Sequence, residues 1–215
     1  MIKEGSSAII CSYCEKSAAI AAIREPLLRC VELLANSFQN GGQLLICGNG
    51  GSCADADHIV GELVKSFRLS RALDPALAAA LREQGDLGIS LTERLQAGLP
   101  AINLGAHNAL LTAMQNDVGG TFAFAQQVMA YGRGGDVLLG ISTSGNSLNV
   151  RYAGAAARAK GMKTVALTGS CGGELAKEFD LVLCAGAEST EDIQDLHSMI
   201  YHVICAALEY QFWGE

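Results

Sequence analysis

The chain has 215 residues, of which 50% are hydrophobic and 17% are charged, a composition typical of a folded globular protein. Its formal charge of −7, with lysines and arginines scattered singly, excludes the basic surface that non-specific binding to nucleic acid or to anionic membranes requires. The longest apolar runs are strand-sized, far short of the roughly 20 residues of a membrane span, so we expect a cytoplasmic protein with no nucleic-acid or membrane partner.

The N-terminal region predicts two packing helices, at 8–23 and at 26–38. A strand at 43–47 follows, and the hydrophobic period changes from that of a strand to that of a helix directly after the turn at 48–52. Residues 69–98 carry helical patches broken by glycines. We expect them to form an inserted helical excursion or lid.

The same order of strand, turn and helix recurs three more times. The predicted units are 136–141 with a helix at 148–160, 163–167 with a helix at 174–178, and 181–184 with a long helix from about 190 to 212, and a further strand is predicted at 100–104. This alternation predicts an α/β fold, a doubly wound parallel sheet of about five strands with helices on both faces. Ligands of such sheets bind beyond the carboxyl ends of the strands.

The length suits one domain over residues 1–215, with N-terminal helices in 1–40 and the helical insertion near 69–98. The apolar composition leaves surface for subunit contacts. Eight cysteines fall mostly inside the predicted helices and strands, which indicates reduced, buried thiols and not a disulfide framework. Cys11 and Cys14 have the spacing of a zinc-binding pair, but no second pair accompanies them, so a structural metal is not expected there.

Two turns of small residues would meet at the carboxyl edge of the sheet. The GNGGS turn (48–52) lacks the third glycine of a dinucleotide fingerprint and the Gly-Lys-Ser/Thr of a nucleotide P-loop. It is either a tight turn with Ser52 as the helix cap or a set of backbone amides open to an anion. The STSGNS turn (142–147) adds four hydroxyls, and hydroxyls with helix N-terminal amides bind phosphate without Lys or Arg. Together the turns favour phosphate binding.

Ionisable side chains stand on two helices. His58 and Glu62 are four residues apart, and therefore on one face of the helix that follows the GNGGS turn. On the C-terminal helix, Gln194 and His202 are about 80° apart around the axis and about 12 Å along it, while His197 projects elsewhere. Two histidines, one carboxylate and one amide oxygen suit zinc or a similar divalent ion, although a surface His–Glu contact is the simpler alternative for the first pair.

As a set, these motifs resemble the sedoheptulose-7-phosphate isomerases, also called phosphoheptose isomerases, of the sugar isomerase (SIS) domain superfamily. The matching stretches are GNGGSxxDAxHxxxE at 48–62, QND at 115–117, GDVLLGISTSGNS at 135–147, KGMKTVALTG at 160–169 and IQDLHxxxxH at 193–202. The resemblance runs in order over most of the chain. It implies a SIS-type domain assembled as a homotetramer, with active sites at subunit interfaces, that converts sedoheptulose 7-phosphate to glycero-manno-heptose 7-phosphate.

The resemblance also implies roles for individual residues. Glu62 matches the family's general base and His202 its general acid, and a zinc ion would be held by His58, Glu62, Gln194 and His202. The substrate and its phosphate would be bound by Asn49, Gly50, Gly51, Ser52, Asn116, Asp117, Ser142, Thr143, Ser144, Ser147 and Gln194. A base for a carbon-bound proton and an acid for the oxygen are what aldose–ketose isomerisation needs.

Three features depart from the family pattern. Ser66 stands where an arginine is usual, Glu191 stands where an aspartate is common, and the 69–98 segment is longer than in compact members. Lys65 or Arg68 is our hypothesis for the missing cation. Three alternatives stay open: a non-catalytic adaptor like the replication-initiator-associating proteins, which have lost the metal-binding histidines, a phosphosugar sensor without turnover, and an isomerase for a different sugar phosphate.

Overall fold

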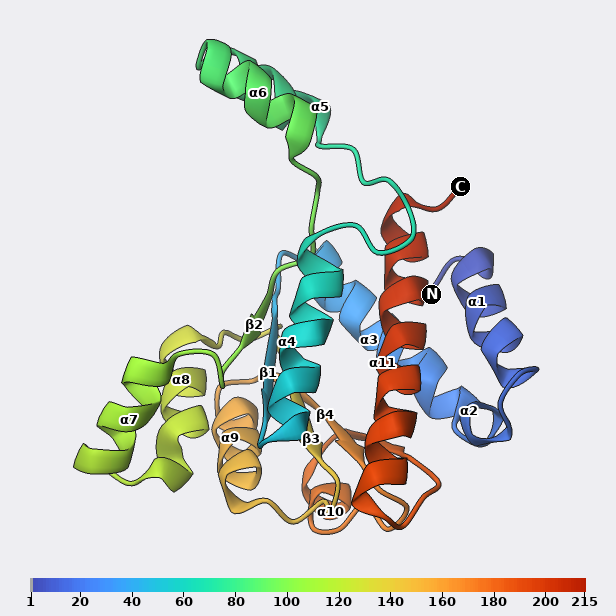
Figure 1. Ribbon diagram of the computed structural model, residues 1–215, viewed down its shortest axis with the longest axis vertical. Helices are drawn as coiled ribbons and strands as arrows, with labels where there is room; N and C mark the ends of the chain where they lie inside the picture. The colour runs from blue at the N-terminus through green and yellow to red at the C-terminus, as the bar shows by residue number, and fades with distance from the viewer. Residues whose placement is uncertain (1) are drawn as a thin grey trace.

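The computed structural model describes residues 2–215, and a five-stranded parallel sheet lies at its centre (Figure 1). The strands are β1 (Leu44–Gly48), β2 (Ala101–Asn103), β3 (Val137–Ser142), β4 (Lys163–Thr168) and β5 (Leu181–Cys184). Their order in the sheet is β2-β1-β3-β4-β5, and every neighbouring pair is parallel. The predicted doubly wound α/β fold is confirmed, and each predicted strand lies within one or two residues of the observed one.

Helices cover both faces of the sheet. One face carries α1 (Glu4–Cys14), α2 (Ala18–Ala22), α3 (Arg24–Gln39), α4 (Gly51–Val64) and α11 (Thr190–Trp213). The other carries α8 (Ala123–Tyr131), α9 (Leu148–Ala159) and α10 (Leu175–Glu178), with α7 (Asn108–Asp117) and a 3-10 turn (Gly120–Phe122) beside them. None of the helices within residues 2–215 is long and apolar enough to cross a membrane.

The strands are buried on both sides, so their alternate side chains enter two separate cores. In β1, Leu44 and Ile46 belong to the core shared with α3, α4 and α11. Leu45 and Cys47 belong to the core shared with α8 and α9. This two-sided burial explains why the strands read as continuous apolar runs in the sequence.

The predicted helix at 8–23 is wrong in one respect, because the structure divides it into α1 and α2. Ser17 has an extended backbone, with φ −142° and ψ 116°, and its side chain accepts a hydrogen bond from the Ile20 amide as the N-cap of α2. The helices α7 and α8 were not predicted. In α7 only Met114 is buried, so the helix shows little of the apolar periodicity on which the prediction depends.

The long insertion contains α5 (Pro75–Arg82) and α6 (Asp86–Arg94), which pack mainly against each other and project from the body as a hairpin (Figure 1). At its base the Ala97 amide donates to the Arg71 carbonyl at 3.1 Å. The insertion is helical as expected, and a role as a lid stays a prediction. It leaves from the C-terminal end of α4, about 20 Å of helix away from the GNGGS turn.

Candidate active site

The strand order reverses between β1 and β3, and in sheets of this order a ligand crevice opens at that point. The GNGGS turn follows β1 and the STSGNS turn follows β3, so the two turns flank the crevice. The side-chain amides of Asn49, in the GNGGS turn, and Asn149, at the start of α9 directly after the STSGNS turn, donate to each other's oxygens, at 3.0 and 2.8 Å. The topology therefore brings the two predicted phosphate-binding turns together.

The GNGGS turn starts α4. Gly50 takes a positive φ of 55° and is the N-cap of α4, a backbone conformation that glycine adopts without strain. Ser52 lies inside the first helical turn, so the interpretation of Ser52 as the cap is wrong. Gly51 allows Gln194 to lie against the turn, because a Cβ there would come within 2.4 Å of the Gln194 Nε2. Gln194 of α11 thus reaches the turn, and its role in substrate binding stays a prediction.

The helix α4 divides into a core face and a site face. Ala56, Ile59 and Leu63 are buried against the sheet, which fixes the rotation of the helix. His58 and Glu62 then share a different face, where His58 Nε2 lies 3.4 Å from Glu62 Oε1.

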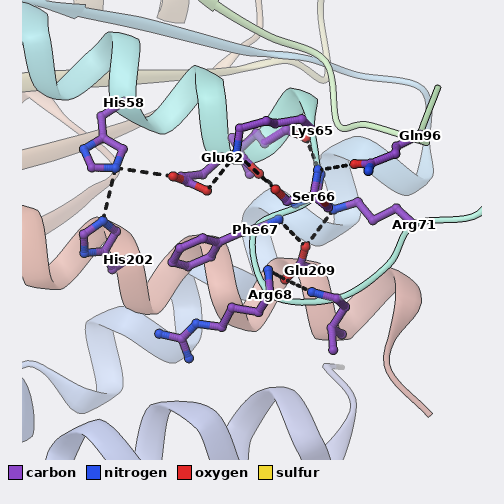
Figure 2. Close-up of polar contacts among 12 residues, drawn as sticks. His58, Glu62, Lys65, Ser66, Phe67, Arg68, Arg71, Gln96, His202 and Glu209 are labelled. Carbon is purple, nitrogen blue, oxygen red and sulfur yellow. Dashed lines mark hydrogen bonds and ion pairs between the residues drawn. The ribbon is translucent and has the colours of Figure 1, made fainter. Parts of the chain in front are cut away.

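The C-terminal helix α11 packs beside α4 and completes this cluster (Figure 2). His202 Nε2 lies 3.3 Å from His58 Nε2, across 144 residues of sequence. The Phe67 ring stacks on His202, with ring centroids 5.6 Å apart and an interplanar angle of 23°. The expected base, Glu62, and the expected acid, His202, therefore both lie next to Nε2 of His58.

The electrostatics of this cluster favour a neutral imidazole beside a carboxylate. Burial, and next the charge of His58, lower the pKa of His202; the charge of Glu62 opposes this shift, and Arg68 adds to it. Glu62 Oε2 is buried and has no hydrogen-bond partner, and its nearest cation is Lys65 Nζ at 3.7 Å. An unsatisfied carboxylate oxygen is available to accept a proton or a cation.

Two neighbours of the cluster were missed by the sequence prediction. The hydroxyl of Tyr201 lies 3.0 Å from His58 Nδ1. Burial, followed by the charge of Asp55, raises the pKa of Tyr201 to about 12. Burial likewise raises the pKa of Asp55. Asp55 stands three residues before His58, so helical spacing alone would have placed it on a neighbouring part of the same face.

The STSGNS turn is tightly built. The hydroxyls of Ser142 and Ser147 lie 2.9 Å apart. Gly145 has a positive φ of 66°, and a Cβ there would come within 2.1 Å of the Gly172 carbonyl oxygen. The turn therefore packs against the turn that follows β4, and a cavity of about 230 Å³ opens between them. That cavity is lined by Thr143, Ser144, Gly169, Ser170, Cys171, Ala187, Glu188 and Ile193.

Two predicted site residues stand apart from the cluster. Asn116 and Asp117 lie at the exposed C-terminal end of α7, and Asn116 Nδ2 donates to Asp117 Oδ1 at 2.7 Å. A larger cavity, of about 570 Å³, is lined by α3 together with Gly135, Val137 and Lys163, at the amino ends of β3 and β4. It holds none of the predicted site residues, so we place the active site at the carboxyl edge.

Imidazole nitrogens and a carboxylate oxygen, the donors of the cluster, are ligand types that zinc takes. Two of the distances between these donor atoms also suit a shared zinc ion. Zinc–nitrogen and zinc–oxygen bonds of 2.0–2.2 Å in a tetrahedron set the ligand atoms about 3.3–3.5 Å apart. The His58–His202 and His58–Glu62 separations are 3.3 and 3.4 Å. Within residues 2–215, however, no group of three or more His, Cys, Asp or Glu side chains is arranged so that it could hold a metal ion. Zinc therefore stays a prediction.

The chain is similar to known proteins over nearly its whole length. It matches the SIS domain family at residues 13–102 and 86–169. A phosphoheptose isomerase of Roseiflexus sp. (strain RS-1) is 42% identical over 184 residues, which cover 86% of this chain and 81% of the relative. One of Helicobacter pylori (strain P12) is 37% identical, covering 90% and 88%.

Solved structures agree with the sequences. The phosphoheptose isomerase of Neisseria gonorrhoeae has a TM-score of 0.72 at 34% identity and covers 92% of each chain. That of Francisella tularensis has a TM-score of 0.73 at 31% identity and covers 93% of this chain and 95% of its own. With the two small-residue turns at the switch point of a SIS-type sheet, the chain belongs to the phosphoheptose isomerase family of SIS domain proteins.

Proposed function

We propose that the protein is an aldose–ketose isomerase that converts sedoheptulose 7-phosphate to D-glycero-D-manno-heptose 7-phosphate. One observation carries the catalytic part of this proposal: Glu62 Oε1 and His202 Nε2 lie 3.4 and 3.3 Å from the same His58 nitrogen. The relatives named phosphoheptose isomerase support the choice of substrate. We also propose a cytoplasmic homotetramer.

The reaction moves a carbonyl from C2 to C1 and needs no net gain or loss of atoms. In the proposed mechanism Glu62 takes the proton from C1 and returns it to C2. His202 gives a proton to the oxygen on C2 and removes one from the oxygen on C1, through an enediol. A positioned acid or base contributes typically 10²–10⁴-fold to the rate. Because its pKa is lowered, the protonated His202 is a stronger acid toward the oxygen on C2, and it regains a proton from the oxygen on C1.

Substrate binding is assigned to neutral groups around the crevice. Ser142, Thr143, Ser144 and Ser147 offer hydroxyls to the phosphate, and the residues of the GNGGS turn, Asn49, Gly50, Gly51 and Ser52, face the same switch point. Gln194 contacts that turn. Asn116 and Asp117 would contact the sugar in a neighbouring subunit, because in their own chain they stand apart from His202.

Ser66 stands where the family usually has an arginine, and we propose that another cation beside the site replaces it. The Arg68 guanidinium lies 5.0 Å from the Phe67 ring centroid and donates to the Tyr13 hydroxyl. Phe67 in turn stacks on His202, so Arg68 is held at the edge of the catalytic cluster. We favour Arg68 over Lys65, whose ammonium group is instead drawn to Glu62.

Zinc would be held by His58, Glu62, His202 and Gln194. When bound, it would supply Lewis-acid stabilisation of the negative charge that develops on the sugar oxygens. The residues of the chain still perform the proton transfers themselves.

The convergence of His58, Glu62 and His202 favours an enzyme over the adaptor that lacks these histidines. A direct test incubates the pure protein, with and without zinc, with sedoheptulose 7-phosphate and a panel of other ketose phosphates, and identifies products by NMR. We expect the seven-carbon aldose phosphate. Turnover of another ketose phosphate alone would reassign the substrate. Thermal stabilisation by sugar phosphates without any product would identify a sensor and contradict the proposal.

A further inference from the structure

The loop that follows α4 is held by one carboxylate of α11. Residues 65–70 form no helix or strand, yet the three amides of residues 67–69 all donate to Glu209, at 2.8, 2.7 and 3.0 Å. Within the described chain these amides have no other acceptor. Glu209 is 1% exposed, so water competes little for these bonds. The position of the loop therefore depends on this side chain.

These contacts require a carboxylate and not merely a polar side chain. Arg71 Nε is a fourth donor, 2.9 Å from Glu209 Oε1, so each carboxylate oxygen accepts two hydrogen bonds. An ionised carboxylate offers about four acceptor sites, and here all of them are used. A glutamine of the same shape would turn an amide NH₂ group toward N–H donors, and the two bonds at that position would be lost.

The loop carries two side chains that border the proposed acid. The Phe67 ring stacks on His202, with centroids 5.6 Å apart (Figure 2). Within residues 2–215 the His202 ring has one hydrogen-bond partner, His58, while the Tyr201 ring meets it edge-on. A single hydrogen bond lets a ring tilt about it, so the plane of His202 depends on its packing against Phe67. The Arg68 guanidinium lies beside Phe67, 5.0 Å from the ring centroid.

We propose that Glu209 is a positioning residue of the active site. By fixing the backbone at 67–69, it holds the Phe67 ring against His202 and keeps Arg68 at the edge of the site. The path is short, because the Phe67 amide donates to Glu209 and the Phe67 ring contacts His202. A displacement of about 1 Å in a reacting group can cost about 10²-fold in rate. Glu209 itself takes no part in the proton transfers.

The effect on catalysis rests on the proposed function, whereas the placement of the His202 ring does not. That placement is measured by ¹H–¹³C NMR of the full chain labelled at its 4 histidines, after treatment with a chelator. A His202→Gln variant assigns the His202 signals. The Phe67 ring shields protons that lie over its face, so both Glu209→Gln and Phe67→Leu should move the His202 ring-proton signals downfield. Phe67→Tyr keeps a flat ring and should leave them in place.

Unmoved His202 signals in Glu209→Gln would overturn the inference, even in an active isomerase. The expected shifts in a protein that makes no heptose phosphate would instead end the isomerase proposal and leave the positioning role standing. If Glu209→Gln does not fold, Phe67→Leu still decides, because unmoved His202 signals in that variant would show that Phe67 does not set the ring plane.

Steady-state kinetics with sedoheptulose 7-phosphate give a second readout, taken below the melting temperature of each variant and expressed per folded protein. Glu209→Gln should lower kcat by about 10–10²-fold through Phe67 and raise KM through Arg68. Phe67→Leu should lower kcat alone, and Phe67→Tyr should retain it. Combining Glu209→Gln with Phe67→Leu should lower kcat no further than the larger single change, because both act through one contact.

Gln211→Leu is the matched control for lost stability. Gln211 is also a buried polar residue of α11, but its side-chain oxygen accepts from the Lys3 amide at 2.6 Å and the Ser6 hydroxyl at 3.3 Å, away from the loop. This variant should unfold more easily while its kcat and KM stay unchanged. A Glu209→Gln variant with the kcat of Gln211→Leu would show that Glu209 only supports the fold and would refute the positioning role.

Discussion

Arg71→Met should destabilise the protein strongly, although Arg71 lies outside the reacting cluster. The Arg71 and Glu209 side chains are 0% and 1% exposed, and Arg71 Nε lies 2.9 Å from Glu209 Oε1. Arg71 also donates to the carbonyl oxygens of Leu63 at 2.6 Å and Glu62 at 2.7 Å. The guanidinium thus joins the C-terminal end of α4, beside the proposed base, to α11 (Figure 2).

The size of the effect follows from the burial of both charges. Removing one partner of a buried ion pair leaves the other uncompensated and costs about 3–5 kcal/mol. A change of 1 kcal/mol shifts the melting temperature by about 2–4 °C in a chain of 150–250 residues. We therefore expect Arg71→Met to lower the melting temperature by about 6–20 °C. Glu209 still accepts the backbone amides of Phe67, Arg68 and Leu69, so the loop itself should stay attached.

Urea unfolding followed by circular dichroism measures the loss of unfolding free energy, and thermal unfolding measures the melting temperature. The matched control is Arg24→Met, which breaks an ion pair with Glu25 whose side chains are 45% and 74% exposed, and exposed pairs of this kind contribute little to stability. Adding Glu209→Gln to Arg71→Met removes the stranded charge and should restore part of the stability. A loss for Arg71→Met no larger than that for Arg24→Met would refute the reasoning.

Three further outcomes are expected. Replacing residues 73–95 by a short Gly-Ser linker should leave the melting temperature nearly unchanged, since a backbone hydrogen bond at Arg71 already closes the base of the hairpin; loss of cooperative unfolding would contradict this. Burial lowers the pKa of His197 in the folded protein. The folded state is therefore more stable above the unfolded pKa of about 6.5, and it loses this stability as the pH falls below that value. The loss is about 1.4 kcal/mol for each unit by which the pKa is lowered. In His197→Gln that part of the pH dependence should vanish, and an unchanged difference in unfolding free energy between pH 8 and pH 5 would be the contrary result. Arg68→Ala should raise KM for the sugar phosphate with little change in kcat, whereas Arg82→Ala in the hairpin should change neither; an unchanged KM for Arg68→Ala would show that another group supplies the cation.

The parts of the fold that sequence predicted well are those set by local pattern. Strand β3 is buried at every position, so it appears as an unbroken apolar run, and the small residues after it mark where the chain must turn. The spacing of His58 and Glu62 fixes them on one face of any helix. These features need no knowledge of how the elements pack.

The parts that sequence could not predict depend on packing between distant elements. His202 reaches His58 only because α11 lies beside α4 with a particular rotation, which the buried residues of both helices set together. Tyr201 precedes His202 and reads as one more apolar position of α11, so its contact with His58 has no local signal. The direction of the α5–α6 hairpin likewise follows from where α4 ends, not from the hairpin's own composition.

The assignment of Glu62 as the base can be tested most directly by Glu62→Gln, which keeps the shape of the side chain and removes its ability to take a proton. Turnover of sedoheptulose 7-phosphate by this variant is compared with that of Glu25→Gln, which changes an exposed carboxylate on α3. We predict that kcat falls by about 10²–10⁴-fold in Glu62→Gln and is unchanged in Glu25→Gln. A Glu62→Gln enzyme that turns over substrate within a few-fold of the unsubstituted protein would contradict the account.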